Sequence, residues 1–169
     1  MRVWNCLAHL PTMVCLSLLL FLSACATQLA PPYDRSLVEG LTTANVEVMT
    51  LFASVSGGTR VEGFANREAK YNEVVGKFDA LVLQAGARPM PRNKVTAEIN
   101  KLLQSKGTPP ISDEDLPSTT ALKKVSEAVA KMRDTDRKQG VTAMEVQAFK
   151  GMASIYLDQA LTYENFLQR

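Results

Sequence analysis

The residues best suited to covalent chemistry lie near the start of this 169-residue chain, where all three cysteines and the only histidine occur within the first 25 positions. Cys25 directly follows two small residues, Ser23 and Ala24. Sulfur is the strongest nucleophile among the ordinary side chains, so Cys25 is the first candidate for a covalently modified residue.

Cys25 ends a segment with the pattern of an export signal. A short start containing Arg2 leads into an almost purely apolar run over residues 10–22. Such a run is too short to span a hydrocarbon core of about 30 Å, which takes about 20 residues. It has the length expected of the apolar region of a secretory signal.

The end of this segment resembles the lipobox of bacterial lipoproteins, an apolar residue and two small residues before a cysteine: Leu22, Ser23, Ala24 and Cys25. The resemblance implies cleavage between Ala24 and Cys25, a diacylglyceryl thioether on the Cys25 sulfur and an acyl group on the new amino terminus. Several acyl chains give stable membrane anchoring. The next residue is Ala26 and not aspartate, which by the same resemblance favours the outer membrane, facing the periplasm. The alternatives are an ordinary cleaved signal with a chance cysteine, or an uncleaved anchor.

Cleavage before Cys25 would leave a domain with few means of catalysis. Residues 25–169 contain no histidine, which Ser-His-Asp, Cys-His and Glu-x-x-His sites require. Their lone cysteine would be alkylated, so zinc and haem ligands are lacking as well. Without Arg2, 18 basic residues face 17 acidic ones, which gives no basic surface for nucleic acid. We therefore expect no enzymatic activity, no metal or cofactor beyond the lipid on Cys25, and no nucleic-acid partner.

Two charged groups further along the chain leave binding functions open. The acidic run over residues 113–115 could bind a hard cation such as calcium, although an acidic turn before a helix is the simpler interpretation. A mixed-charge cluster could dock a partner or lipid head groups, but it is expected to be an exposed, salt-bridged face: Lys131, Arg133, Asp134, Asp136, Arg137 and Lys138.

A third polar group lies near the C-terminus. Tyr156, Tyr163 and Glu164 could line a pocket, but tyrosines at this spacing are more often core residues with hydroxyls at the rim. Asp158 and Glu164 could form a carboxylate pair for glycoside cleavage only if they converged to about 5–9.5 Å.

Apolar residues recur at helical period along the rest of the chain. They predict helices over about 34–56, 63–87, 93–105, 118–139 and 142–167. The clearest stripe belongs to the first: Leu37, Leu41, Ala44, Val48, Leu51, Phe52 and Val55. The last helix is expected to be the most buried, along a seam widened by Ala153, Ile155 and Ala160: Phe149, Met152, Tyr156, Tyr163 and Phe166.

The ends of these helices carry recognisable signals. Asp34 and Ser118 are expected N-caps, and Thr142 with Glu145 fits a capping box. Glycines at 57, 58 and 140 are expected to stop helices.

These elements predict an all-α fold, an antiparallel bundle of four long helices plus one short helix. The expected organisation is a signal peptide over residues 1–24, a lipidated cysteine and tether over 25–33, and the bundle over 34–169. The leading functional hypothesis is a non-enzymatic envelope lipoprotein that binds or scaffolds another envelope component.

Two other functions remain open. The first is a carrier or sensor with an apolar ligand in the bundle core, lined by methionines: Met49, Met132, Met144 and Met152. The second is a cell-wall hydrolase that uses Asp158 and Glu164.

Overall fold

The computed structural model describes residues 30–89, 101–102, 104–105, 107 and 116–168. The predicted signal, the lipobox with Cys25 and the acidic run at 113–115 therefore lie outside the described residues. So does most of the short helix predicted over 93–105, of which residues 101, 102, 104 and 105 are described and helical.

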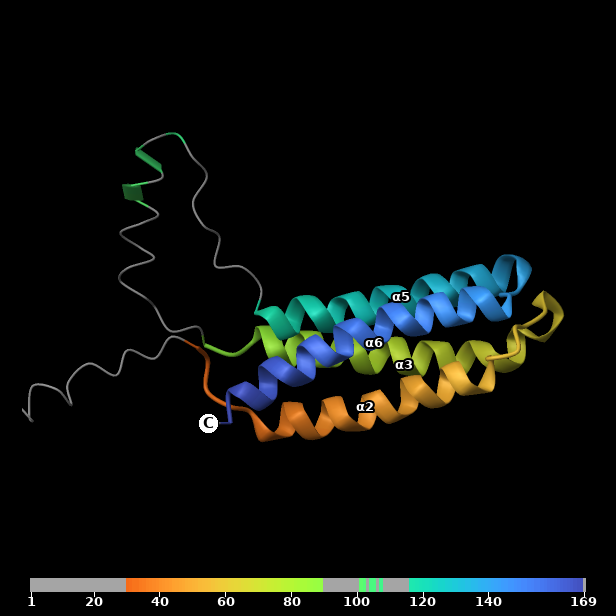
Figure 1. The fold of residues 1–169 in the computed structure, drawn as a ribbon, viewed down its shortest axis with the longest axis horizontal. Helices are drawn as coiled ribbons and strands as arrows, with labels where there is room; N and C mark the ends of the chain where they lie inside the picture. The colour runs from red at the N-terminus through yellow and green to blue at the C-terminus, as the bar shows by residue number, and fades with distance from the viewer. Residues whose placement is uncertain (1–29, 90–100, 103, 106, 108–115, 169) are drawn as a thin grey trace, which may run out of the picture.

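Four long helices form the described domain, namely α2 (Arg35–Ser54), α3 (Ala65–Gly86), α5 (Pro117–Gln139) and α6 (Ala143–Phe166). A short 3-10 helix, η1 (Val61–Gly63), precedes α3. Successive helices run in opposite directions (Figure 1). Each packs against two others, so that α2 lies diagonally across from α5, and α3 from α6. The predicted all-α bundle of four long helices is confirmed.

The core is built from one apolar stripe per helix. Every residue of the predicted α2 stripe is at most 2% exposed. The apolar stripe of α3 also faces the core, with Tyr71, Val74 and Phe78 almost completely buried. Each large apolar side chain buried in this way contributes roughly 1.5–3 kcal/mol to stability.

Two of the predicted helix starts are confirmed and one is wrong. The Asp34 carboxylate accepts a hydrogen bond from the Leu37 amide at 3.1 Å, and Thr142 and Glu145 form the capping box. Ser118 is not an N-cap, because α5 already begins at Pro117, whose fixed φ suits the first turn. The Ser118 side chain is instead buried.

The predicted seam of α6 is only partly right, since Phe149, Ala153 and Ala160 are buried as expected but other members are not. Met152 and Phe166 are 41% and 59% exposed, and the buried line runs along a neighbouring face: Val146, Phe149, Ala153, Leu157, Ala160 and Glu164. The small side chains of Ala153 and Ala160 are completely buried in this line. Nor is α6 the most buried helix, since it has six buried residues and α5 has ten.

Two boundaries differ slightly from the prediction. The helix α2 ends at Ser54, before the glycines at 57 and 58. The helix α5 ends at Gln139, and Gly140 follows directly as its C-cap, as predicted. Within the predicted 25–33 tether, Pro31 is buried, whereas Pro32 is exposed.

Candidate functional site

Among the described residues, two clusters of polar side chains are each centred on a buried carboxylate, one at each end of the bundle. The turn-end cluster lies where α2 leads into α3 and α5 into α6, and comprises Thr59, Arg67, Tyr71 and Asp136. The terminal-end cluster lies at the opposite end and comprises Arg88, Ser118 and Glu164.

Asp136 is the centre of the turn-end cluster and is completely buried. One carboxylate oxygen accepts hydrogen bonds from Thr59 Oγ1 at 2.5 Å and Arg67 Nη2 at 2.8 Å. The other accepts from Arg67 Nε at 2.9 Å and Tyr71 Oη at 3.1 Å. A carboxylate has about four lone-pair sites, so these four donors leave no room for a metal ion or a substrate proton.

The electrostatics of Asp136 also argue against a role as a general base. Burial raises its pKa, but the hydrogen bonds from Arg67 and Thr59 outweigh burial and hold the pKa below the ordinary 3.8. Burial next to Asp136 raises the pKa of the Tyr71 hydroxyl, so that group stays neutral. The cluster is therefore a fixed ion pair and not a proton-transfer site.

Hydrogen bonds to the backbone also join the two turns at this end of the bundle. The Thr59 amide donates to the Val141 carbonyl at 2.7 Å, and the Val141 amide donates to Thr59 Oγ1 at 3.0 Å. Gly140 lies between α5 and α6 with a φ of +77°, and a Cβ there would stand 2.5 Å from the Thr59 carbonyl oxygen. Only glycine permits this approach, which joins the α2–α3 connection to the α5–α6 turn.

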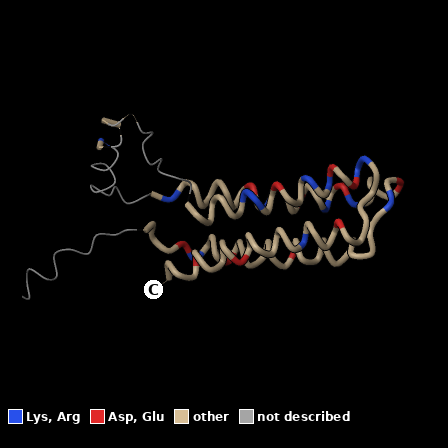
Figure 2. Tube along the Cα trace, turned by 45° about the horizontal axis from the view of Figure 1, so that its top comes forward, with Lys and Arg blue, Asp and Glu red and all other residues tan. Residues whose placement is uncertain are grey.

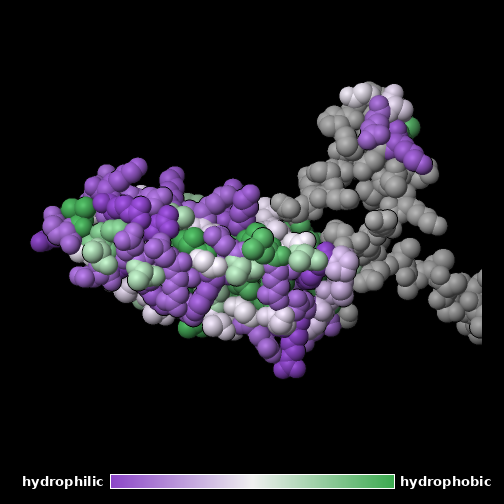
Figure 3. Space-filling view, turned by 180° about the vertical axis from the view of Figure 1, so that it is seen from behind, coloured by the Kyte–Doolittle hydropathy of each residue, from purple (hydrophilic) through white to green (hydrophobic). Residues whose placement is uncertain are grey.

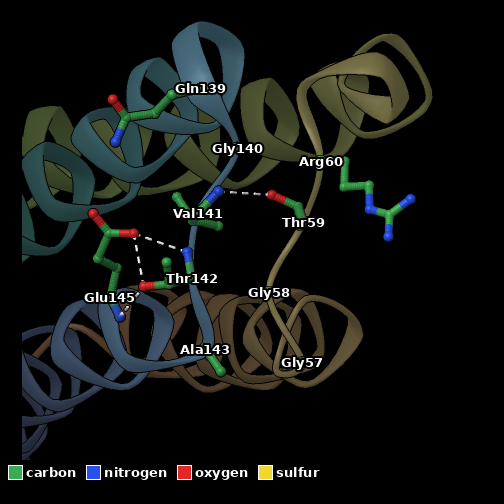
Figure 4. Close-up of a pocket in the computed structure, with 10 residues that line it drawn as sticks. All are labelled: Gly57, Gly58, Thr59, Arg60, Gln139, Gly140, Val141, Thr142, Ala143 and Glu145. Atoms are coloured by element: carbon green, nitrogen blue, oxygen red, sulfur yellow. Dashed lines mark hydrogen bonds between the residues drawn. The ribbon is translucent and has the colours of Figure 1, made fainter.

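A shallow depression of about 520 Å³ opens beside these two turns, between residues 57–60 and 139–145 (Figure 4). The side chain of Arg60 points away from it. The Glu145 carboxylate and the Thr142 hydroxyl already pair with each other and with the first amides of α6. The N-terminus of α6 is therefore capped from within by these two side chains.

We expect the pH dependence of stability to report on Asp136. Because its folded pKa lies below the ordinary value, the carboxylate contributes stability above about pH 4 that is lost as the pH falls through the folded pKa. Urea unfolding between about pH 5 and pH 2 should show a shallower loss in Asp136→Asn than in the wild type. Parallel curves for the two proteins would contradict this assignment.

The terminal-end cluster is the second buried ion pair. Arg88 donates from Nη1 and Nη2 to the two carboxylate oxygens of Glu164, at 2.8 and 2.6 Å. Its Nη2 also donates to Ser118 Oγ at 3.1 Å, and its Nε to the Ala85 carbonyl at 3.3 Å. The pair thus ties the end of α3 to the start of α5 and the end of α6, across the long α3–α5 connection.

This geometry does not bring together the predicted carboxylate pair. Asp158 lies on the exposed surface of α6, whereas Glu164 points into the bundle and is neutralised by Arg88. Tyr156 and Tyr163 are half-buried on α6. Asp158 and Glu164 point in different directions because a separation of six residues places two side chains on different faces of a helix.

The mixed-charge cluster predicted for α5 is partly wrong. Asp136 belongs to the interior, whereas Lys131, Arg137 and Lys138 are exposed. Arg137 pairs across the surface with Glu68 at 2.6 Å. What remains is an exposed, salt-bridged face.

The four methionines expected to line a ligand cavity do not all face the bundle core. Met132 is completely buried and Met49 packs against the core, but Met144 is 82% exposed and Met152 is 41% exposed. The predicted lining is therefore wrong for Met144 and Met152, which the faces of α6 direct outward.

A signal for the burial of Asp136 and Glu164 was present in the sequence. Asp136 follows Met132 by four residues, and Glu164 follows Ala160 by four, so each continues an apolar stripe at helical spacing. A charged residue on a stripe predicts a buried partner, but the partner itself depends on which helices are neighbours.

Among the described residues, no group of His, Cys, Asp and Glu is arranged to hold a metal ion. The described helices include none with the length and apolarity to cross a membrane. Comparison of the chain with family models, curated proteins and solved structures gave no match.

Proposed function

We propose that this chain is a bacterial envelope lipoprotein, anchored by lipid on Cys25 in the outer membrane facing the periplasm. In this proposal its helical bundle binds or scaffolds another envelope component without catalysing a reaction. The observation that carries the proposal is the sequence Leu22, Ser23, Ala24, Cys25 at the end of the apolar run over residues 10–22.

The use made of buried ionisable groups supports a non-enzymatic role. Asp136 and Glu164, the buried carboxylates of the described domain, are occupied by arginines and hydroxyl groups of the same domain. Groups held in this way stabilise the fold and are not available to a substrate.

The burial of Pro31, shortly after Cys25, supports a domain that lies close to its lipid anchor. Only residues 26–30 separate Cys25 from this buried proline. Fully extended, the six steps from Cys25 to Pro31 reach about 20 Å. A lipid on Cys25 would therefore keep the terminal end of the bundle near the bilayer.

Cys25→Ala tests the anchor. We expect the wild type to incorporate labelled palmitate and to give a mature N-terminal peptide whose mass corresponds to acylated Cys25. Cys25→Ala should incorporate no label and should retain residues 1–24, because neither thioether formation nor the following cleavage can occur. Cys15→Ala is the matched control and should behave as the wild type. A Cys25→Ala protein that is cleaved normally and stays equally bound to membranes would overturn the proposal.

The partner is tested separately, by crosslinking intact cells and purifying the chain from solubilised membranes. The proposal expects the same envelope protein to be recovered in repeated preparations and lost from Cys25→Ala cells. Recovery of no specific partner under any growth condition would contradict the scaffolding role but not the anchor.

A further inference from the structure

The outward face of α6 is almost free of charge. Its residues, the α6 outer stripe, recur at helical spacing and are all exposed: Met144, Ala148, Gly151, Ile155, Gln159 and Thr162. Met144 and Ile155 are 82% and 60% exposed. A helix that faces only water carries charged and polar residues on this side, so the stripe is atypical of a solvated surface.

The contrast with the other half of the bundle is clear. The helices α2 and α6 carry three and four charged residues, whereas α3 and α5 carry six and nine (Figure 2). Seen from the back of the view in Figure 1, hydrophilic residues cover much of the surface, with apolar residues scattered among them (Figure 3). A need for solubility therefore does not explain why α2 and α6 carry so few charged residues.

Gly151 adds an independent observation. It lies in the middle of α6, where glycine costs roughly 0.5–1 kcal/mol relative to alanine. A Cβ at this position would meet no described residue within 4 Å, so packing within the described part of the chain does not require glycine. Its missing side chain would instead let another backbone approach the centre of the stripe.

We propose that the α6 outer stripe and the adjoining face of α2 form an interface between two copies of this chain. The helix α2 packs beside α6 and presents Thr42, Val46 and Thr50 outward, with Val46 63% exposed. The two α6 helices run antiparallel across a two-fold axis close to Ser154, which places Gly151 and Ile155 at the centre.

Charge complementarity fixes this arrangement. Lys150 and Asp158 make no ion pair with any described residue, and they turn towards the same flank of the stripe. They stand four residues before and after Ser154. Antiparallel pairing about Ser154 therefore sets Lys150 of one copy opposite Asp158 of the other, twice in the dimer. A two-fold interface is self-complementary in this way.

The size of the face is sufficient. A 24-residue helix is about 36 Å long, and two adjacent helices are about 20 Å wide. Such a face buries about 700 Å² on each copy, or about 1,400 Å² in total, within the range of about 1,200–2,000 Å² for specific interfaces. A lipid surface is a poorer occupant, because interfacial helices use Lys, Arg and Trp. The basic residues gather on α5, and the only tryptophan is Trp4.

The first experiment measures the mass of the full chain in a mild detergent by analytical ultracentrifugation. The wild type should sediment as a dimer, and Ile155→Glu should weaken association at least tenfold. Leu83→Glu is the matched control, because Leu83 is 75% exposed on α3 and lies outside the proposed face. A monomeric wild type, or equal effects of the two variants, would overturn the proposal.

The second experiment reverses the flanking charges and identifies the occupant. Lys150→Glu and Asp158→Lys should each weaken the dimer, and the double variant should restore it, which only a second copy of this chain can explain. Loss of vesicle binding by Ile155→Glu without any dimer would point to lipid and overturn the proposal. The Cys25→Ala chain should dimerise as well, so failure of the dimer and failure of the lipid anchor are distinguishable.

Discussion

Glu164→Ala is expected to lower the free energy of unfolding by about 3–5 kcal/mol, since it leaves the charge of a buried arginine uncompensated. Arg88 donates two hydrogen bonds to Glu164, and its guanidinium is only 6% exposed. Water cannot replace the lost acceptor there. Urea unfolding of the full chain, followed by circular dichroism, measures the change.

Two further variants separate the buried charge from the loss of a side chain. Glu127→Ala removes an exposed partner of Lys124 and should cost less than about 1 kcal/mol. Replacing both members of the buried pair, as Arg88→Met with Glu164→Leu, should recover most of the loss. If the double variant were as unstable as Glu164→Ala, the stated cause would be wrong.

Asp136→Ala is expected to cost about 3 kcal/mol, because it removes the shared acceptor of Thr59, Arg67 and Tyr71. Arg67 is partly exposed and regains some hydration, which keeps the loss at the lower end of the range for buried pairs. The change should be greatest at the turn end of the bundle. Hydrogen exchange should therefore accelerate at the amides of Thr59 and Val141 more than in the middle of α5.

Asp134→Ala is the matched control for this prediction. Asp134 lies two residues away on the same helix and makes only a surface contact with Arg133 at 3.0 Å. It should leave the exchange of the Thr59 and Val141 amides unchanged. Equal acceleration in the two variants would show that Asp136 does not fasten the turns.

The helical bundle could be predicted from sequence because each helix carries its own periodic signal. The α2 stripe is predictable residue by residue, since Leu, Val and Phe dominate it and recur at helical spacing. The α6 seam is predictable only in part, because Met152 and Phe166 are large and apolar yet face outward, while the smaller Ala153 and Ala160 are completely buried. Side-chain size is a poor guide where close packing selects small residues.

The buried ion pairs could be predicted less well, because each joins distant parts of the chain. Arg88 falls between Gly86 and Pro89 in a segment that resembles an ordinary corner, and its partner Glu164 is 76 residues away. Asp136 lies among exposed charges, which hides its position on the apolar stripe. Cys25 differs from both, because its prediction depends on local sequence alone, and it stays a prediction.

The two ion pairs also determine how the helices are aligned along the bundle axis. A purely apolar stripe repeats every turn, so a helix could slide past its neighbours by about 5.4 Å and still bury similar groups. Asp136 is held at one end of the bundle and Glu164 at the other. A slip in either direction would leave a buried carboxylate without its arginine partner. Substitutions in the apolar core between the two ion pairs can therefore accumulate without shifting the helices, provided that both ion pairs remain in place.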